Sequence, residues 1–244
     1  MSAGSPKVYT LPPGCSFADA LAQGLLKRYP DPMELSSVLV LLPTRRAART
    51  LREAFLRASD GALLLPGMQP LGDVDEEELS LGTLSLAETN ALDTQPAISP
   101  LRRQMELARL VEAWLKTDSD SEDDPDPAQV ISLARELGRL LDQMQIEKVS
   151  FEALKGLAPA EFADHWQKTL AFLDIVGAHW PAHLAEHGLT DPALRRNRLL
   201  DQLSAHWRNS PPAHPVIAAG STGSIPATAE LLKTIAFLPQ GEII

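Results

Sequence analysis

The chain has 244 residues, of which 44% are hydrophobic, and it carries a formal net charge of −10. This length allows one large domain or two small ones with a real core, and the acidic balance argues against a protein that coats nucleic acid over its whole surface. The single cysteine, Cys15, excludes an internal disulfide and any paired-cysteine zinc or iron–sulfur motif. The N-terminus has no apolar signal segment and no apolar run approaches the ~18 residues of a membrane span, so we expect a cytoplasmic protein with no membrane contact.

Strand and helix patterns alternate in the N-terminal part of the chain. The predicted elements are, in order, a strand at Val8–Leu11, a helix at Phe17–Arg28, a strand at Ser37–Leu42 and a helix at Arg45–Ala58, followed by either a third strand or an extended crossing at Leu63–Leu65 and Gln69–Leu71. Ser16 is placed to cap the first helix. Short strands that alternate with helices predict a parallel sheet. The segment Gly72–Pro96 is acidic, above all at Asp73–Glu78, and is interpreted as a solvated loop.

The sequence period becomes helical after this loop and stays so for most of the remaining chain. Helices are predicted from Ser99 to Leu115, at Ala128–Gln145, at Pro159–His179 and at Pro192–Arg208, with an acidic linker at Asp118–Pro127. A strand at Val216–Ala219, a glycine turn at Gly220–Ser224, a helix at Ile225–Phe237 and the start of a strand at Gly241–Ile244 follow. We therefore predict an α/β domain, residues 1–98 and 211–244, with an inserted helical subdomain, residues 99–210. Because domains seldom stop inside a buried strand, we expect a fragment of a longer polypeptide.

The most informative stretch for chemistry is Val38–Leu56. A short apolar run ends at Pro43 and Thr44, and Arg45 and Arg46 then open an amphipathic helix. Backbone N–H groups, a hydroxyl cap and positive side chains at a helix start suit a phosphate group, in particular that of a nucleic-acid backbone. The alternative is an ordinary strand–helix unit whose arginines lie on a solvated face. Thr44, Arg45 and Arg46 are the predicted DNA-binding residues.

Two turns lie where nucleotide-binding motifs would be expected. Pro12–Ser16 follows the first predicted strand, but a P-loop needs GxxxxGK[ST], and the next lysine after this turn is Lys27. Gly220–Ser224 is similar to the glycine turn of some NADPH-binding proteins, although Pro226 stands where a small residue would let the helix approach the strand. An NADPH-dependent oxidoreductase fragment is therefore one alternative function, and a purely structural interaction module is another.

Three histidines spaced by four residues could share one helix face as metal ligands: His179, His183 and His187. Pro181 interrupts the first pair, Gly188 ends the helix and no carboxylate or cysteine completes a ligand set, so we interpret them as a solvated helix end. Cys15 is interpreted as a small packing residue. The tryptophans are interpreted as residues of the core or of a subdomain interface rather than as base-stacking platforms: Trp114, Trp166, Trp180 and Trp207.

Six segments resemble the N-terminal part of AddB, the second subunit of the bacterial AddAB helicase–nuclease, in its alphaproteobacterial form. They are Val8–Leu26, Val40–Leu56, Leu63–Leu79, Ile98–Val111, Glu161–Val176 and Pro215–Leu232. The runs GDVDEEEL and AAGSTGSIPAT are the most specific. Val38–Leu56 is also similar to the second conserved motif of superfamily 1 helicases, in which a strand ends in a threonine-containing loop before a helix rich in alanine and basic residues.

This resemblance implies a P-loop-NTPase-like fold of superfamily 1 helicase type, in which a helical subdomain interrupts the first ATPase-like domain. It places Gly220 and Ser221 where the Walker B acids would be, so both halves of the ATP machinery are missing and no catalytic or cofactor-binding residue is expected here. It implies a role in double-strand break repair, with DNA and an AddA-like helicase–nuclease subunit as partners. The complex uses ATP and magnesium, and the family's nuclease domain and iron–sulfur cluster belong to a region that this chain lacks.

Overall fold

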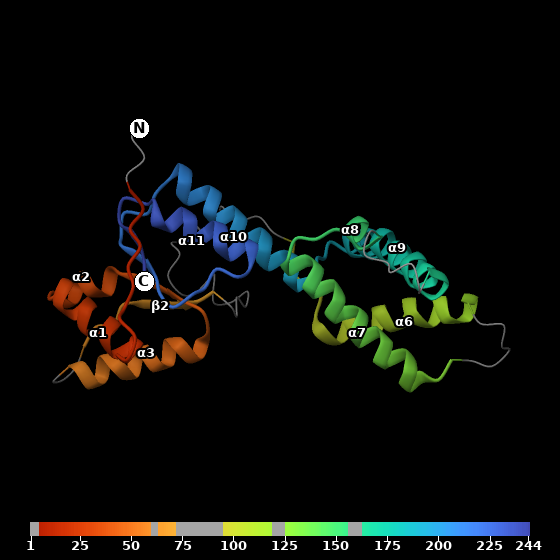
Figure 1. Cartoon of the computed structure of the whole chain (residues 1–244), viewed down its shortest axis with the longest axis horizontal. Helices are drawn as coiled ribbons and strands as arrows, with labels where there is room; N and C mark the ends of the chain where they lie inside the picture. The colour runs from red at the N-terminus through yellow and green to blue at the C-terminus, as the bar shows by residue number, and fades with distance from the viewer. Residues whose placement is uncertain (1–4, 60–62, 72–94, 119–124, 156–162) are drawn as a thin grey trace. The chain divides into compact units, whose positions relative to one another are not determined.

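The computed structural model describes residues 5–59, 63–71, 95–118, 125–155 and 163–244 (Figure 1). The chain divides into an α/β unit, Met1–Asp93 with Leu199–Ile244, and a helical unit, Thr94–Arg198. The second boundary of this division falls inside helix α10 (Pro192–Asn209). The acidic run at Asp73–Glu78 and most of the predicted linker after Asp118 lie outside the described residues.

The α/β unit contains a four-stranded sheet in the order β2-β1-β3-β4, and every pairing is parallel, as predicted. The strands are β1 (Leu39–Leu42), β2 (Gly67–Pro70), β3 (Val216–Ala218) and β4 (Gly241–Ile243). In the central pair, Leu39 lies opposite Val216 and Leu41 opposite Ala218. Both central strands are buried on their two faces, which explains why their sequences are continuously apolar rather than alternating.

Helices cover both faces of this sheet (Figure 1). They are α1 (Phe17–Arg28), α2 (Pro32–Ser37) and α3 (Arg45–Ala58) on one side, and α11 (Pro226–Ala236) with the second part of α10 on the other. Alternate residues of β1 divide between two hydrophobic clusters: Val40 faces α1 and α3, whereas Leu39 and Leu41 face α10 and α11. The predicted bounds of α1 and α3 are confirmed at both ends.

Two predicted strands are wrong at their bounds. Val8–Leu11 forms only an isolated parallel bridge between Val8 and Ile243, because prolines follow at once and the exposed Val8 and Tyr9 gain little burial from a longer ladder. The strand predicted from Ser37 begins at Leu39, because a short helix ends at Ser37. That helix, α2, was not predicted; the Asp31 side chain caps it by accepting a hydrogen bond from Met33 N at 2.9 Å.

The helical unit is built from α6 (Pro100–Asp118), α7 (Pro127–Ile146), α8 (Phe151–Lys155) and α9 (Ala163–Glu186), followed by the first turns of α10. Its core is one cluster of apolar side chains from α6, α7 and α9. The prediction that Pro181 breaks the histidine-bearing helix is wrong, because α9 continues through Pro181 to Glu186 and gives up one backbone hydrogen bond there. Among the described residues, no helix is both long enough and apolar enough to cross a membrane.

Candidate nucleic-acid interface

The N-terminal end of α3 follows directly from the end of β1. Thr44 takes the N-cap position, and its side-chain oxygen accepts a hydrogen bond from Ala47 N at 3.1 Å. This bond satisfies one of the free N–H groups of the first turn, and it leaves the hydroxyl hydrogen of Thr44 free to donate to a ligand. The sequence pattern therefore placed the start of the helix correctly.

Arg45 and Arg46 occupy the first two helical positions, and both side chains are exposed. The buried stripe of α3 consists of other residues: Ala48, Leu51, Ala54 and Phe55. The first turn of the helix contains no acidic residue, so two guanidinium groups lie at the positive end of the helix dipole. That arrangement costs about 0.3–1 kcal/mol per charge, and a bound anion at the helix start would reverse the sign. The electrostatics of α3 therefore favour an anionic ligand.

Two further arginines continue this surface, and neither was among the predicted DNA-binding residues. Arg49 and Arg52 stand four and seven positions after Arg45, which puts all three on one side of the helix, and both are exposed. Among the residues that the structure describes, neither of them nor Arg46 forms an ion pair with a carboxylate. From Arg45 to Arg52 the helix rises roughly 10 Å, a length over which a basic row can follow a nucleic-acid backbone. The spacing of four and seven was the signal that could have identified them.

The α3 start lies at a point where the chain changes direction across the sheet. After β1, α3 leads to β2 on one side; after β3, α11 leads to β4 on the other side. In parallel α/β sheets, ligands bind outside the carboxyl ends of the strands at such a switch point. Ala219 N donates to Leu41 O at 2.9 Å, so these two strands end side by side. The structure therefore brings Thr44 and the Gly220–Ser224 turn to the same edge, which we call the switch-point edge.

The start of α1 lies against the same edge. Gly220 has φ of +70°, and a Cβ added there would lie 3.3 Å from Cε1 of Phe17, so the first residue of α1 covers this glycine. Ser16 precedes Phe17 at the N-cap position, but its side chain makes no capping hydrogen bond, contrary to prediction. Cys15 is exposed and its thiol donates to Pro12 O at 3.0 Å, so its prediction as a packing residue is wrong.

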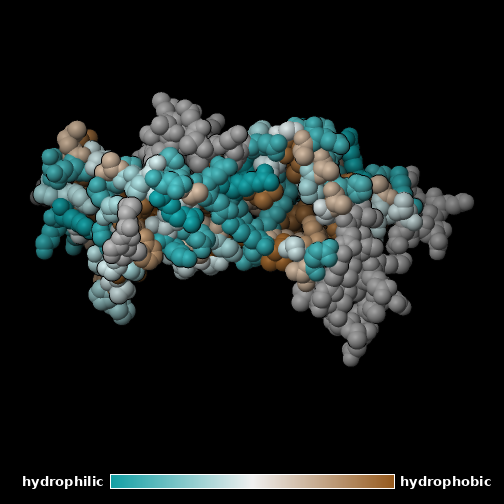
Figure 2. All heavy atoms as spheres, turned by 90° about the horizontal axis from the view of Figure 1, so that it is seen from above, coloured by the Kyte–Doolittle hydropathy of each residue, from teal (hydrophilic) through white to brown (hydrophobic). Residues whose placement is uncertain are grey.

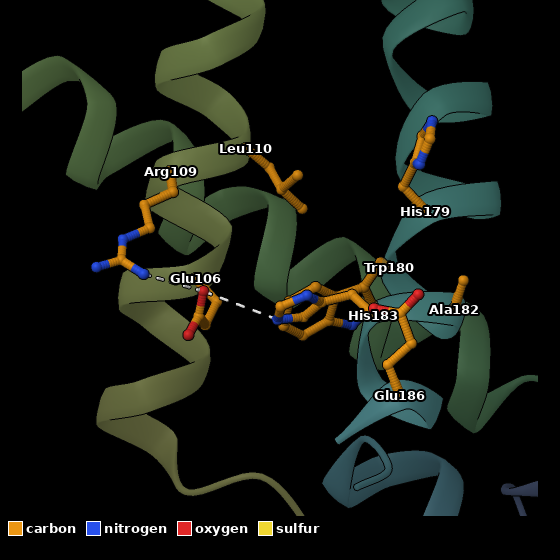
Figure 3. Close-up of a pocket in the computed structure, with 8 residues that line it drawn as sticks. All are labelled: Glu106, Arg109, Leu110, His179, Trp180, Ala182, His183 and Glu186. Atoms are coloured by element: carbon orange, nitrogen blue, oxygen red, sulfur yellow. Dashed lines mark hydrogen bonds and ion pairs between the residues drawn. The ribbon is translucent and has the colours of Figure 1, made fainter. Parts of the chain in front are cut away.

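The three predicted histidines belong to the helical unit, whereas the switch-point edge belongs to the α/β unit. Their surroundings include a hollow of about 330 Å³ between α6 and α9 (Figure 3). His183 points across it toward Glu106, with Nε2 3.8 Å from the carboxylate, whereas His179 projects away from that pair. His183 also stacks on Trp180, with ring centroids 5.8 Å apart. No group of three or more metal-ligating side chains comes together within the described ranges.

The predicted core role of the tryptophans is confirmed for Trp180 and Trp207. Both side chains are fully buried, the first in the helical unit and the second beneath the sheet of the α/β unit. Neither offers a face on which a base could stack.

Neither a protein-family model nor any curated protein matches the sequence of this chain. Function is therefore inferred from the segment resemblances, from the fold and from the chemistry of the switch-point edge.

Proposed function

We propose that this chain is the N-terminal part of an AddB-type subunit of a bacterial helicase–nuclease that processes double-strand DNA breaks in the cytoplasm. Its α/β unit, as a P-loop-NTPase-like domain without nucleotide chemistry, holds single-stranded DNA through Thr44, Arg45 and Arg46. The helical unit corresponds to the subdomain that interrupts the first domain of superfamily 1 helicases. This assignment rests on the segment resemblances, on the parallel sheet and on the helical block between β2 and β3.

The observation that carries the DNA-binding role is the exposed arginine row at the start of α3. Its members lie outside the buried stripe, they begin at the switch-point edge, and the first turn of the helix holds no acid. A protein of net charge −10 repels nucleic acid over most of its surface, so a local basic row decides where a phosphate backbone can approach. Contacts of this kind position a strand without reading its sequence.

The proposal assigns no ATP chemistry to the chain. Pro12–Ser16 contains no lysine to neutralise a nucleotide phosphate, and after Gly220 the next carboxylate in the chain is Glu230. The AddA-like partner would dock on an apolar surface of the helical unit. Figure 2 shows apolar patches over the helical unit, and that unit exposes large side chains on α6, where Leu101 is 74% and Met105 is 46% exposed.

The test is binding of a short oligothymidine strand at several salt concentrations, for the chain alone and for its complex with the partner subunit. Arg45→Ala/Arg46→Ala should weaken binding and lower the salt slope by about 1.4, since each phosphate contact on a single strand contributes about 0.7. The matched control is Arg135→Ala/Arg139→Ala, which removes the same charge from exposed positions on α7. Equal affinity and slope for both double variants would return the α3 arginines to a solvated face and refute the proposal.

The alternative functions give different results in the same samples. An NADPH-dependent oxidoreductase fragment would bind NADPH far more tightly than inorganic phosphate and lose that binding when the Gly220–Ser224 turn is altered. A purely structural interaction module would bind neither oligonucleotide nor NADPH. The DNA-binding proposal predicts oligonucleotide binding, and no NADPH binding tighter than that of inorganic phosphate.

A further inference from the structure

We propose that the Gly220–Ser224 turn and the Thr228 hydroxyl together bind one phosphate group at the switch-point edge. The inference rests on the proposed function in one respect, which is the source of the phosphate: we assign it to the DNA strand that Arg45 and Arg46 hold. The site extends that function to a second element, because it lies after β3 and on α11 rather than on α3.

The turn offers backbone N–H groups to a ligand. Gly220 and Gly223 both have positive φ, +70° and +63°, which turns the chain sharply between β3 and α11. A Cβ added at Gly223 would lie 3.1 Å from Cδ1 of Leu232, so the turn lies close against α11. Among the described residues, no backbone hydrogen bond uses the N–H groups of residues 221–224 as donors. Successive free N–H groups in such a turn form a concave site for an anion.

The start of α11 has no side-chain cap. Ile225 occupies the N-cap position and cannot accept a hydrogen bond through its side chain, whereas Thr44, Asp31 and Asp126 cap α3, α2 and α7. The N–H groups of the first turn of α11 therefore lack the acceptor that those helices have. An uncapped start alone does not define a site, and the independent observation is a buried hydroxyl in the same turn.

Thr228 is the third residue of α11, and it is 5% exposed. Its hydroxyl oxygen is buried and has no hydrogen-bond partner within the described part of the chain. Side chains on a helix lean toward the helix N-terminus, which is the end of α11 that the Gly220–Ser224 turn joins. Leaving a buried hydroxyl unpaired costs about 1–3 kcal/mol. A phosphate oxygen seated in the turn would supply the missing acceptor.

The chemistry of the surroundings selects a phosphate over a cation. The segment from Ala219 to Thr228 carries no carboxylate, and its side-chain polar groups are the hydroxyls of Ser221, Thr222, Ser224 and Thr228. Arg45 and Arg46 follow the neighbouring strand. N–H donors, hydroxyls and guanidinium groups are the partners of an anion.

The experiment follows backbone amide signals by NMR while the whole chain is titrated with inorganic phosphate, oligothymidine or AMP in separate samples. The test variant is Thr228→Val, which keeps the shape of the side chain and removes the hydroxyl. Thr228→Ser keeps the hydroxyl and should bind as wild type does. The matched control is Thr234→Val on the same helix, because Thr234 is also a buried residue but its hydroxyl donates to Glu230 O at 2.9 Å.

We expect phosphate and oligothymidine to shift the amide signals of residues 220–224. Thr228→Val should weaken both by about tenfold, the loss expected for one hydrogen bond to a charged group, without lowering Tm. Thr234→Val should leave both affinities unchanged. An absence of shifts in this turn with all three ligands, or equal affinities for Thr228→Val and wild type, would overturn the inference.

The three ligands and the two sets of variants distinguish a failure of this inference from a failure of the proposed function. If AMP shifts these amides and oligothymidine does not, the assignment of the phosphate to DNA is overturned. If Arg45→Ala/Arg46→Ala has no effect on DNA while Thr228→Val weakens phosphate binding, the proposed function fails and the phosphate site stands. If the arginine variant weakens DNA binding and Thr228→Val changes nothing, the phosphate site alone fails.

Discussion

Replacing Asp191 by alanine should destabilise the helical unit by about 4 kcal/mol. Asp191 immediately precedes α10, and its side chain is 2% exposed. Its carboxylate accepts three hydrogen bonds of 2.7 Å, from Arg103 Nε, Gln145 Nε2 and Trp180 Nε1. These donors come from α6, α7 and α9, so one buried anion joins three helices of the unit.

The magnitude follows from what the substitution leaves behind. Removing one partner of a buried ion pair costs about 3–5 kcal/mol, because the other charge stays buried. Arg103 keeps a second partner, Asp142, at 2.8 Å, which favours the lower end of that range. The indole N–H of Trp180 then has no acceptor, and an orphaned buried donor costs about 1–3 kcal/mol. Since such terms are not additive, about 4 kcal/mol is the expected total, or roughly a thousandfold in the unfolding equilibrium.

The assay is urea unfolding of the whole chain followed by far-UV circular dichroism, with hydrogen exchange to locate the change. Exchange should accelerate in α6, α7 and α9 and stay unchanged in β1 and β3. The matched control is Glu136→Ala, which breaks a 2.6 Å ion pair with Arg139 whose side chains are 62% and 65% exposed, and it should cost less than about 1 kcal/mol. If Asp191→Ala costs no more than this control, the carboxylate does not hold the three helices together.

Two further predictions concern the α/β unit. Gly241→Ala should lower the free energy of unfolding by about 2–3 kcal/mol, because the added Cβ would collide with the carbonyl of Ile235. Gly24 lies in a helix interior, and a Cβ added there meets no atom within 4 Å, so Gly24→Ala should raise the free energy of unfolding by about 0.5–1 kcal/mol. Thermal unfolding of both variants checks these two values. The Ser16 hydrogen bond holds the pKa of Asp19 below its ordinary value of 3.8. The stabilisation this provides is present above pH 3.8 and is lost as the pH falls through the lowered pKa of the folded state, so Ser16→Ala should move the Asp19 titration, followed by carboxyl NMR, up toward 3.8.

The parts of the fold that depend on local signals could be predicted from the sequence. The ends of α3 follow from a threonine cap and the spacing of apolar residues, and the structure confirms both. The six-residue α2 is too short to show a helical period and was missed. The Val8–Leu11 segment shows the opposite error, since a strand needs a partner as well as a composition, and β4 provides one for a single bridge. Glu242 in β4 is buried against Arg28, 214 residues away, and no local pattern indicates such a pair.

The candidate site also has features that could be predicted from the sequence and features that could not. Each of its turns could be identified alone, because a proline or glycine turn between a strand and a helix has a recognisable sequence. Their meeting at one edge could not be predicted, since it depends on the strand order β2-β1-β3-β4. The contact between Phe17 and Gly220 is the clearest example, because the ring that covers this glycine comes from the other end of the chain.

Thr228 shows why a functional residue can look structural in the sequence. In the apolar pattern of α11 a threonine looks like a substitute for valine, and Thr234, six residues later, behaves in that way, since its hydroxyl donates to a carbonyl of its own helix. The hydroxyl of Thr228 has the same chemistry and no such bond in the described chain. A valine at position 228 would avoid the free-energy cost of a buried hydroxyl without a hydrogen-bond partner. The Thr228 hydroxyl therefore stabilises the protein only when a ligand supplies that partner. The comparison of Thr228→Val with Thr234→Val therefore measures ligand binding and not the loss of a hydroxyl as such.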